Sequence, residues 1–530
     1  MQDLNLPEMI LTSNWDTYGQ GHSHNGSAGI FARVNYDYKG IYLVELSGRY
    51  DGSSKFPTHS QWAFFPSGSV GYRISEEAYF QAAKEYVSNL KLRGSYGVIG
   101  NQEIGANMFL ETMTNKNSKG EILTINWLGS GDVKYVYFDQ PKMVDPSLTW
   151  ETIATTNVGI DLGFLNNDLN VNFDWYQRDT KGMLAPGKNL PSVIGATAAK
   201  ENAGSLRTRG WELNIDYRHI FQEADGLAIH ANFNLADYKA VVTNWGQPDD
   251  PKLTNDYSTG KEYGEIWGFK TDRYFTPEDF NADGTYKEGI ADQTLLAVDP
   301  KFNFGPGDIK FVDQNGDGKI DWGEGTAENH GDLIKIGNTT PRWQYSFRLG
   351  AEWKGLDIDL FFQGVGKRDM WSTSAFVMPM MRAADITIYA NQTDYITKEE
   401  IEAGNIRQDA DYPRLFPGNE GKTAAATIMD GGRNNYVPQD KYLINMAYLR
   451  LKNLTVGYTL PQKWTRKATI EKVRIYASFN NLADLVNNTA KYGFDPEVSR
   501  GKEGANFGNG AYARTAPLMR SYSFGLQVTL

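Results

Sequence analysis

The segment FVDQNGDGKIDWGE, residues 311–324, places oxygen-bearing side chains at nearly every second position. Counted from Asp313, the pattern matches the loop with which calcium-binding helix–loop–helix proteins coordinate the ion. A hard cation takes six or more oxygen ligands, and the seventh position of such a loop supplies its main-chain carbonyl. The expected ligands of a structural Ca²⁺ ion are Asp313, Asn315, Asp317, Lys319, Asp321 and Glu324.

Two further residues agree with this interpretation. Gly318 occupies the sixth position, where the chain must turn sharply, and Ile320 occupies the eighth, where an apolar side chain anchors the loop. The alternative is a surface turn rich in aspartate and asparagine that binds no metal. The completeness of the match favours calcium, at the concentrations found outside cells.

The flanks of the loop differ from those of a calcium sensor, which has a helix on each side. Upstream, GPGDIKFV combines glycine and proline with strand-like alternation. Downstream, GEGTAENHGD contains too much glycine to begin a stable helix. We therefore expect a calcium-type loop, residues 307–324, that stabilises a β-protein locally.

The composition indicates a large all-β protein. The 530 residues carry 53 basic and 64 acidic side chains, and the net charge of −11 argues against nucleic acid as a partner. Glycine (54) and tyrosine (30) are abundant, as in proteins with many short alternating strands. The sequence has no cysteine, no visible signal peptide and no apolar run long enough for a transmembrane helix. The sequence is still compatible with a membrane β-barrel, because the strands of such a barrel need only one apolar face.

Alternation over about ten residues is the main structural signal. In DLNVNFDWYQRDTK, Leu169, Val171, Phe173 and Trp175 share one face, and polar residues occupy the other. Aromatic residues near strand ends suit a lipid interface, and charges and amides on the opposite face suit a wet lumen. We expect about thirteen antiparallel strands. They lie near residues 28–38, 41–51, 61–74, 90–98, 148–163, 167–181, 206–218, 226–238, 341–352, 355–366, 443–458, 472–481 and 519–530.

The expected connections alternate between short turns and long loops. In outer-membrane barrels the short turns are periplasmic and the long loops extracellular. One short connection, residues 75–89, has apolar residues at helical spacing and predicts a periplasmic helix. The long loops are expected near residues 99–147, 182–205, 239–340, 367–442 and 482–518.

Several segments together resemble the SusC/RagA family of TonB-dependent outer-membrane transporters. They occur in family order and include FARVNYDYKGIYLVELSGRYDGSSKF, NLKLRGSYGVIGNQEIG, WETIATTNVGIDLGF, GDIKFVDQNGDGKID, YLRLKNLTVGYTLP and VRIYASFNNLADL. The resemblance implies a transmembrane β-barrel of about 22 strands with an N-terminal plug. It implies a place in the lipid of a Gram-negative outer membrane and energy from TonB. It also implies a SusD-like surface lipoprotein as partner, an oligosaccharide or peptide as substrate, and a calcium-type loop on the outside.

The resemblance covers only part of such a transporter. Residues 1–530 are similar to the C-terminal barrel portion, and the plug, the TonB box and roughly nine strands of the family pattern are absent. An odd number of strands also differs from the even numbers of bacterial barrels. We therefore expect a fragment of a longer importer, which could not be energised by itself. Leu530 stands where such barrels usually end in phenylalanine, which weakens the expected assembly signal.

Residues for catalysis are scarce. His22 and His24 lie in a flexible glycine-rich stretch, and without cysteine there is no thiol nucleophile. No glycine-rich segment has the full spacing of a phosphate-binding loop. We therefore expect no enzyme, although a secreted, calcium-stabilised carbohydrate-active enzyme or an adhesin is the alternative. The residues expected to pack inside the loops are Trp127, Trp245, Trp267, Trp371 and the run VMPMM at 377–381.

Overall fold

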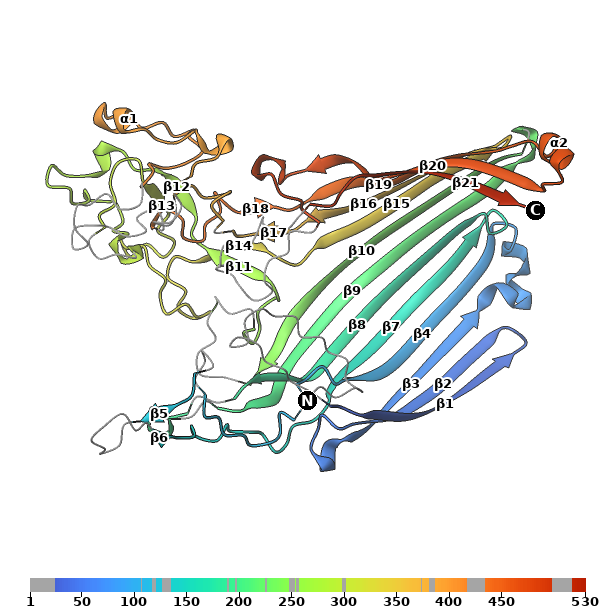
Figure 1. Cartoon of the computed structure of the whole chain (residues 1–530), viewed down its shortest axis with the longest axis horizontal. Coiled ribbons are helices and arrows are strands. Elements are labelled where there is room, and N and C mark those ends of the chain that lie inside the picture. Colours follow the sequence, from blue (N-terminus) through green and yellow to red (C-terminus); the bar gives the residue numbers. More distant parts are fainter. Residues whose placement is uncertain are drawn as a thin grey trace.

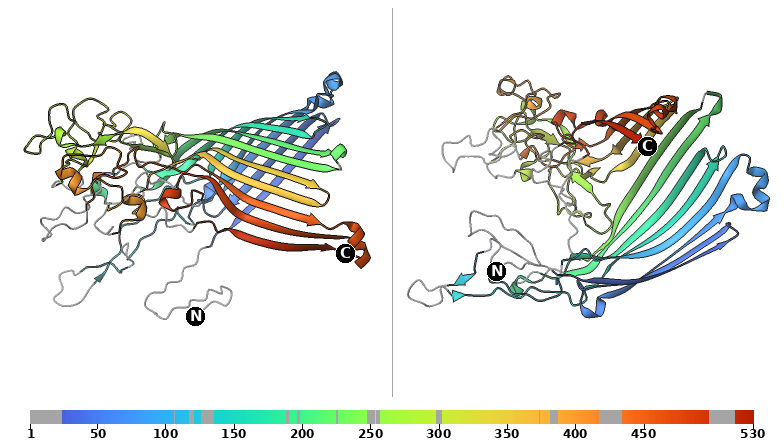
Figure 2. Two further views of the ribbon diagram at one scale, coloured as in Figure 1. Left: turned by 90° about the horizontal axis from the view of Figure 1, so that it is seen from above. Right: turned by 45° about the vertical axis from the view of Figure 1, so that its right-hand side comes forward.

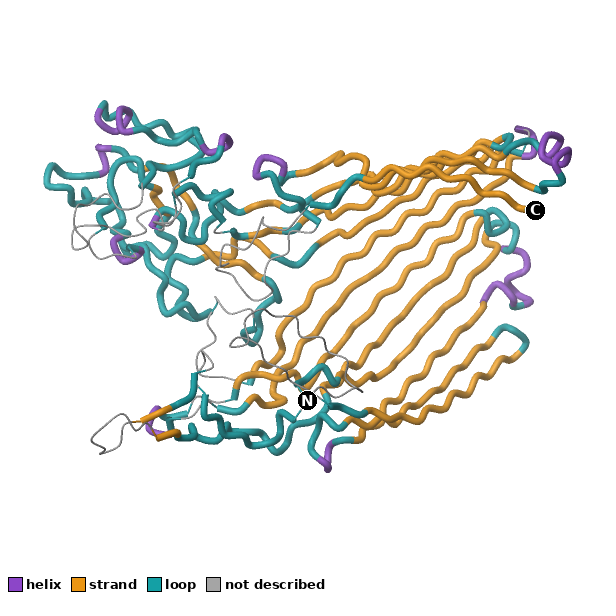
Figure 3. The backbone as a smooth tube through the Cα atoms, viewed as in Figure 1, coloured by secondary structure: helices purple, strands orange, loops and turns teal. Residues whose placement is uncertain are grey.

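One sheet of 13 strands dominates the protein. It curves into a trough with the long loops gathered at one end and the short turns at the other (Figure 1). In the described part of the chain, helical segments occur only as short turns in the connections (Figure 3). The computed structural model describes residues 24–530 except 106, 117–120, 126–134, 188–189, 196–197, 225, 247–252, 254–256, 298–301, 373, 381–386, 417–433 and 498–516.

The strands of the sheet follow chain order, and each is antiparallel to its neighbours. They are β1 (Ser27–Tyr38), β2 (Tyr42–Ser53), β3 (Trp62–Arg73), β4 (Val87–Asn101), β7 (Glu151–Phe164), β8 (Leu169–Pro186), β9 (Lys200–Phe221), β10 (Leu227–Trp245), β15 (Arg342–Trp353), β16 (Leu356–Lys367), β19 (Tyr448–Thr459), β20 (Lys472–Asn487) and β21 (Ser521–Thr529). Within the described residues, β1 and β21 each leave one edge without a strand partner.

Smaller elements lie in the connections. The loop strands are β5 (Thr124–Ile125), β6 (Tyr135–Val136), β11 (Glu265–Gly268), β12 (Thr271–Tyr274), β13 (Ile309–Phe311), β14 (Ile334–Asn338), β17 (Asp369–Met370) and β18 (Ile444–Asn445). The helical segments are α1 (Lys398–Glu402), α2 (Gln462–Thr465), η2 (Thr58–Ser60), η3 (Ile74–Glu76), η4 (Ala78–Ala83), η5 (Ser192–Ile194), η6 (Gln222–Ala224), η7 (Pro277–Asp279), η8 (Thr294–Leu296), η9 (Ala390–Gln392), η11 (Arg466–Ala468) and η12 (Ala490–Tyr492). None of the helices in the described residues has the length and apolarity needed to cross a membrane.

The register of the sheet sorts polar from apolar side chains. Phe173 lies opposite Leu213 on one face. Asn172 lies opposite Asn214, which in turn lies opposite Asn234, on the other face. Because neighbouring residues of a strand point to opposite faces, a slip by one residue would mix the two sets. The alternation in the sequence therefore determines the pairing. The sheet is curved (Figure 2), and a hollow on it is lined by residues of the polar set such as Asn172, Asn214 and Asn234.

The expected strands are confirmed, but several of them run into segments predicted as loops. β10 continues to Trp245, inside the loop predicted over residues 239–340, and β8 and β9 differ in the same way. The segment 182–205 is predicted as a long loop, whereas β8 continues to Pro186 and β9 begins at Lys200. The register shifts on both sides of Met183. This irregularity interrupts the alternation in the sequence while the backbone pairing continues, which explains why the pattern misplaces the loop.

The helix predicted over residues 75–89 is wrong in type and in extent. The segment forms the two short turns η3 and η4, and β4 already begins at Val87. A helix this short is marginal without tertiary support. The available support favours the turns, because the hydroxyl groups of Tyr72 and Tyr79 lie 2.7 Å apart and hold η4 against β3.

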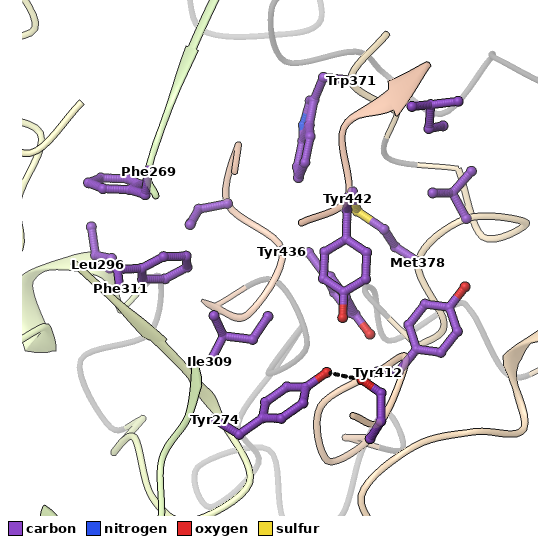
Figure 4. Packing of buried hydrophobic residues seen from close by; sticks show 14 of the residues in the cluster. Phe269, Tyr274, Leu296, Ile309, Phe311, Trp371, Met378, Tyr412, Tyr436 and Tyr442 are labelled. Atoms are coloured by element: carbon purple, nitrogen blue, oxygen red, sulfur yellow. Dashed lines mark hydrogen bonds between the residues drawn. The ribbon is translucent and has the colours of Figure 1, made fainter. Parts of the chain in front are cut away.

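The main hydrophobic core lies in the long loops and not in the sheet. It draws on the connection between β10 and β15, the connection between β16 and β19, and the segment after β20. Figure 4 shows aromatic and aliphatic side chains from these loops gathered in one cluster. Its fully buried members include Phe269, Phe275, Ile309, Ile320, Val377, Met378 and Met446.

Trp267, Trp371, Val377 and Met378 agree with the expected internal packing of the loops, whereas Trp245 does not. Val377, Met378 and Trp371 belong to the loop core, and Trp267 packs against it. Trp245 instead ends β10 and stacks on Tyr257, with ring centroids 4.2 Å apart. The predictions for Trp127 and Met381 lie outside the described residues.

Candidate functional site

The concave face of the sheet is a continuous polar wall. Two hollows of about 430 and 910 Å³ open on it. In the smaller hollow Asn214 Nδ2 donates to Asn234 Oδ1 at 2.6 Å, and Asn234 Nδ2 donates to Ser346 Oγ at 3.2 Å. Amides and hydroxyls both donate and accept, so this strip of wall can hydrogen-bond to neutral polar groups such as sugar hydroxyls or peptide units.

Most charges on the wall belong to cross-strand pairs. Arg93 on β4 contacts Asp161 on β7 and Asp174 on β8, each at 2.8 Å. Arg474 donates to Asp357 from Nε at 2.9 Å. In the larger hollow a third group combines Arg348, His230 and Asp359, with contacts of 2.8 and 3.0 Å to the carboxylate. Such pairs tie together strands that are adjacent or one strand apart, and they offset one another's charge on the wall.

The convex face is apolar and exposed. Ile30 is 73% exposed, Phe524 81% and Leu526 65%. An apolar surface that spans a whole sheet is not found on soluble monomers, because it would associate in water. This face therefore requires an apolar environment.

Aromatic rings stand at both ends of the convex face. At the short-turn end, Tyr42 stacks on Tyr72 with ring centroids 5.1 Å apart. At the loop end, Trp175 lies opposite Trp211, whose ring is 6.1 Å from that of Trp343. An apolar band bordered by aromatic girdles is the outer surface of a membrane-spanning barrel.

The calcium-type loop closes on its own backbone. Asp313 accepts the amides of Gly316 and Gly318 at 2.6 and 2.9 Å, one on each carboxylate oxygen. Asn315 Oδ1 accepts the amide of Asp317, and Asp317 Oδ1 accepts that of Lys319, at 3.0 and 2.9 Å. Gly318 has a φ of +81°, which a residue with a side chain adopts only with strain. The glycine at the sixth position is thus explained by the turn.

Two residues that the loop pattern does not include hold the loop in place. Asp332 is fully buried and accepts the amides of Gln314 and Asp321 at 2.7 and 2.8 Å. The main-chain carbonyl of Asp292 accepts the amide of Ile320, and the amide of Asp292 donates to the carbonyl of Gly318, both at 2.9 Å. Neither residue belongs to the loop motif, so spacing alone could not identify them.

The surroundings of the loop confirm that it is not part of a helix–loop–helix unit. It follows the strand β13, and turns follow it through Leu333. Ile320 is fully buried in the loop core, as its position in the motif predicts. The oxygen-only donor set suits a hard cation. In the described residues no three carboxylate, imidazole or thiol groups converge as a ready-made metal site.

Burial and ion pairing shift two carboxyl groups in this region in opposite directions. Burial raises the pKa of Asp332, and the negative charge of Asp313 adds to the effect. Burial also opposes ionisation of Asp279, but Arg273 contacts both of its oxygens at 2.6 and 2.7 Å and lowers its pKa to about 2. Asp279 thus forms a strong structural pair beside the loop core.

Two of the described histidines each contact one carboxylate. His219 Nδ1 lies 2.6 Å from Asp168, and His230 Nε2 lies 3.0 Å from Asp359. His22 lies outside the described residues, and His24 is exposed, as its glycine-rich surroundings predict. Neither described pair is accompanied by a nucleophile or a third ligand.

Comparison with known proteins agrees with this architecture. The profile of the family described as "TonB dependent receptor-like, beta-barrel" matches residues 7–482. TonB-dependent receptor P3 of Formosa agariphila is 26% identical over 515 residues, which are 94% of this chain and 45% of that receptor. TonB-dependent receptor SusC of Bacteroides thetaiotaomicron is 26% identical over 520 residues, 92% of this chain and 44% of SusC.

A solved structure shares the fold. The structure of the RagAB peptide importer in its "open-open" state superposes with a TM-score of 0.67 at 20% identity, covering 96% of this chain and 47% of that one. The chain thus spans about half the length of the curated relatives it matches.

The two faces of the sheet, its aromatic girdles and its alternating connections define an outer-membrane β-barrel protein. The chain belongs to the TonB dependent receptor-like β-barrel family and is of the SusC/RagA type. The short turns are accordingly periplasmic, and the long loops, including the calcium-type loop, are extracellular.

Proposed function

We propose that this chain forms part of a TonB-energised importer that takes up oligosaccharides or peptides together with a SusD-like surface lipoprotein. The carrying observation is the curved sheet, whose concave wall is polar and whose convex face is apolar. Such a sheet separates a wet passage from lipid. The wall offers neutral amides and paired charges, which suit a hydroxyl-rich or peptide substrate better than a strongly charged one.

The extracellular loops supply the second part of the proposal. Their common core makes them one packed body at the outer mouth of the barrel. Inside it, the fully buried carboxylate of Asp308 receives Arg414 Nε at 2.8 Å and Asn435 Nδ2 at 2.8 Å. A packed body of this kind can act as a platform for a lipoprotein partner, whereas separate flexible loops would lose entropy on docking.

Growth of the host on defined nutrients tests the import proposal. The gene for the full-length protein would be deleted, and the strain would be grown on oligosaccharides or on peptides as limiting nutrient. We expect a growth defect on one of these classes, rescued by the wild-type gene only when TonB is functional. Normal growth on every oligosaccharide and peptide tested would contradict import of these substrates.

Co-purification tests the lipoprotein partner. The full-length protein, tagged and extracted in mild detergent, should retain a surface lipoprotein at a one-to-one ratio. Phe269→Ala, which removes a fully buried ring from the loop core, should reduce that ratio. Full retention of the partner by a variant whose loop core has become protease-sensitive would assign docking to another surface.

The calcium-type loop would bind a structural ion through Asp313, Asn315, Asp317, Lys319, Asp321 and Glu324. A bound Ca²⁺ would neutralise the clustered carboxylates and cross-link the loop. Asp332 and Asp292 would position the loop without needing to contact the ion.

Terbium luminescence tests the ion site, because Trp322 directly follows Asp321 and can sensitise a lanthanide bound in the loop. We expect a signal that Ca²⁺ displaces and that the double substitution Asp313→Ala with Asp317→Ala abolishes. Asp283→Asn changes another exposed loop carboxylate and serves as the matched control. An equal signal in the double variant and the control would exclude this loop as the site.

A further inference from the structure

Four cationic side chains gather on the convex face at its extracellular end. They are Lys181 on β8, Arg207 and Arg209 on β9, and Lys239 on β10. We call this group the cationic patch. Lys239 lies opposite Arg209, and Arg207 lies two residues further along β9 on the same face. Lys181 lies opposite Ser205, the next residue of that face. Three adjacent strands thus build the patch.

The patch begins where the apolar band ends. Along β9 the outward side chains are Ile215, Leu213, Trp211, Arg209 and Arg207 in order, because alternate residues share a face. Two residues advance a strand by about 7 Å. The first cationic row is therefore one step beyond Trp211, and along β8 Gln177 follows Trp175 in the same way. That is the level at which lipid headgroups meet the aromatic girdle.

Most of the positive charge on the patch is uncompensated. Arg207 is paired with Asp179 at 2.6 Å, but Arg209 Nε donates only to the neutral Oε1 of Gln177, at 2.8 Å. In the described residues, neither Lys181 nor Lys239 forms an ion pair, and both are exposed. Four cations thus face one paired carboxylate, in a protein whose net charge is −11.

Toward β4 the charge does not continue, and on the other side the neighbouring strand β15 carries Arg342, whose charge is paired with Asp237 of β10. The row of Arg209 continues through Gln177 to Thr156 on β7 and Tyr96 on β4. The row of Arg207 continues through Asp179 to Ala154. A general preference for cations at this depth would repeat around the sheet, so the patch is a localised site.

We propose that the cationic patch binds the phosphate groups of a phosphorylated glycolipid in the external leaflet of the membrane. Guanidinium forks and ammonium groups are the side chains that bind phosphate best. The apolar band directly below would receive the acyl chains of the same molecule, so one ligand would cover both surfaces. A soluble acidic protein would use the charges but not the band, which favours the lipid.

Lipid binding to the full-length protein tests this site. The probes are diphosphoryl lipid A and the same lipid without phosphates, titrated onto detergent-solubilised protein and followed by native mass spectrometry. The test variant is Lys181→Gln with Arg207→Gln, Arg209→Gln and Lys239→Gln. Its matched control removes four cations at the periplasmic end, by Lys463→Gln with Arg466→Gln, Lys467→Gln and Lys472→Gln.

We expect the test variant to lose phosphorylated-lipid affinity by about fivefold for each cation removed, and the control to keep it. The milder pair Lys181→Gln with Lys239→Gln breaks no described ion pair and should lose part of the affinity even if the fourfold variant assembles poorly. The proposal is overturned by equal affinity of the pair variant and the wild type, or by equal binding of the dephosphorylated lipid. The proposal would also be overturned if the wild type retained an acidic protein and no lipid, while the fourfold variant did not retain that protein.

Discussion

The sheet and the extracellular loops of this protein place their apolar side chains in opposite ways. In the sheet, large apolar residues such as Phe524 are directed outward and are 81% exposed, while amides and charges line the concave wall. In the loops, Phe269, Phe275 and Ile309 are fully buried. One chain therefore carries two folding patterns, one for lipid and one for water.

The difference shows which interactions stabilise each region. The sheet depends on backbone pairing, cross-strand ion pairs and the surrounding lipid. The loop body depends on the hydrophobic effect in water and on buried polar groups such as Asp308. Asn435 donates to Asp308 from Nδ2 and accepts the amide of Ile309 on Oδ1, both at 2.8 Å. Substitutions should consequently act on one region and leave the other intact.

The largest effect is expected in the loop core. Phe269→Ala removes a ring that packs against Phe311 and Trp322, at centroid distances of 5.4 and 4.8 Å. Loss of a buried phenylalanine costs about 3–5 kcal/mol. Hydrogen exchange in the loops should rise sharply, while the heat-resistant migration of the barrel on gels stays unchanged. If the heat-resistant migration were lost together with the protection of the loops, the two regions would not fold independently.

A charged residue introduced on one face of β9 should have a different effect from the same residue on the other face. Ile215 lies between Val171 and Phe233 on the convex face, whereas Asn214 lies on the polar wall. Ile215→Arg should cost roughly 2–4 kcal/mol near the bilayer midplane. Asn214→Arg should cost less, because its charge stays on the wet face of the sheet. Denaturant unfolding in lipid vesicles measures both. Equal costs at these neighbouring positions would contradict the assignment of the faces.

A smaller effect is expected from pH in the loops. The folded pKa of Asp279, about 2, lies below its usual value of 3.8. Its ionised form therefore stabilises the folded loops by roughly 2 kcal/mol. This contribution is fully present above about pH 4, and it is lost as the pH falls toward 2. Loop protection measured by hydrogen exchange should follow this dependence. Asp279→Asn should be less stable at neutral pH, and its acid sensitivity in this window should be reduced.

The sequence predicted the sheet far better than the loop body. Period-two alternation in β8, β9, β15 and β21 gave both the strands and their faces, because a strand with one lipid face and one wet face has the clearest possible pattern. The calcium-type loop was equally visible as a local motif. The partners that hold it, Asp292 and Asp332, have no local signal, because tertiary contacts bring them to the loop.

Tertiary contacts also decide the structure of the loops and turns that the sequence could not predict. The core contact between Ile309 and Asn435 joins residues 126 positions apart, and neither segment alternates regularly. The helical spacing around Tyr79 indicated an α-helix, but the contact with Tyr72 and the early start of β4 decided the local structure. Patterns of short range predict elements, whereas long-range contacts decide how irregular segments pack.

The loop core also constrains the order of events during biogenesis. Its two main contributing connections are separated in the chain by the hairpin of β15 and β16. Asn435 reaches Ile309 only after this hairpin has been threaded and the second connection has been exported. The surface body can therefore form only when both connections lie on the same side of the membrane. Either connection alone lacks the apolar partners that bury its share of the core, and in that state a protease would cleave it most readily.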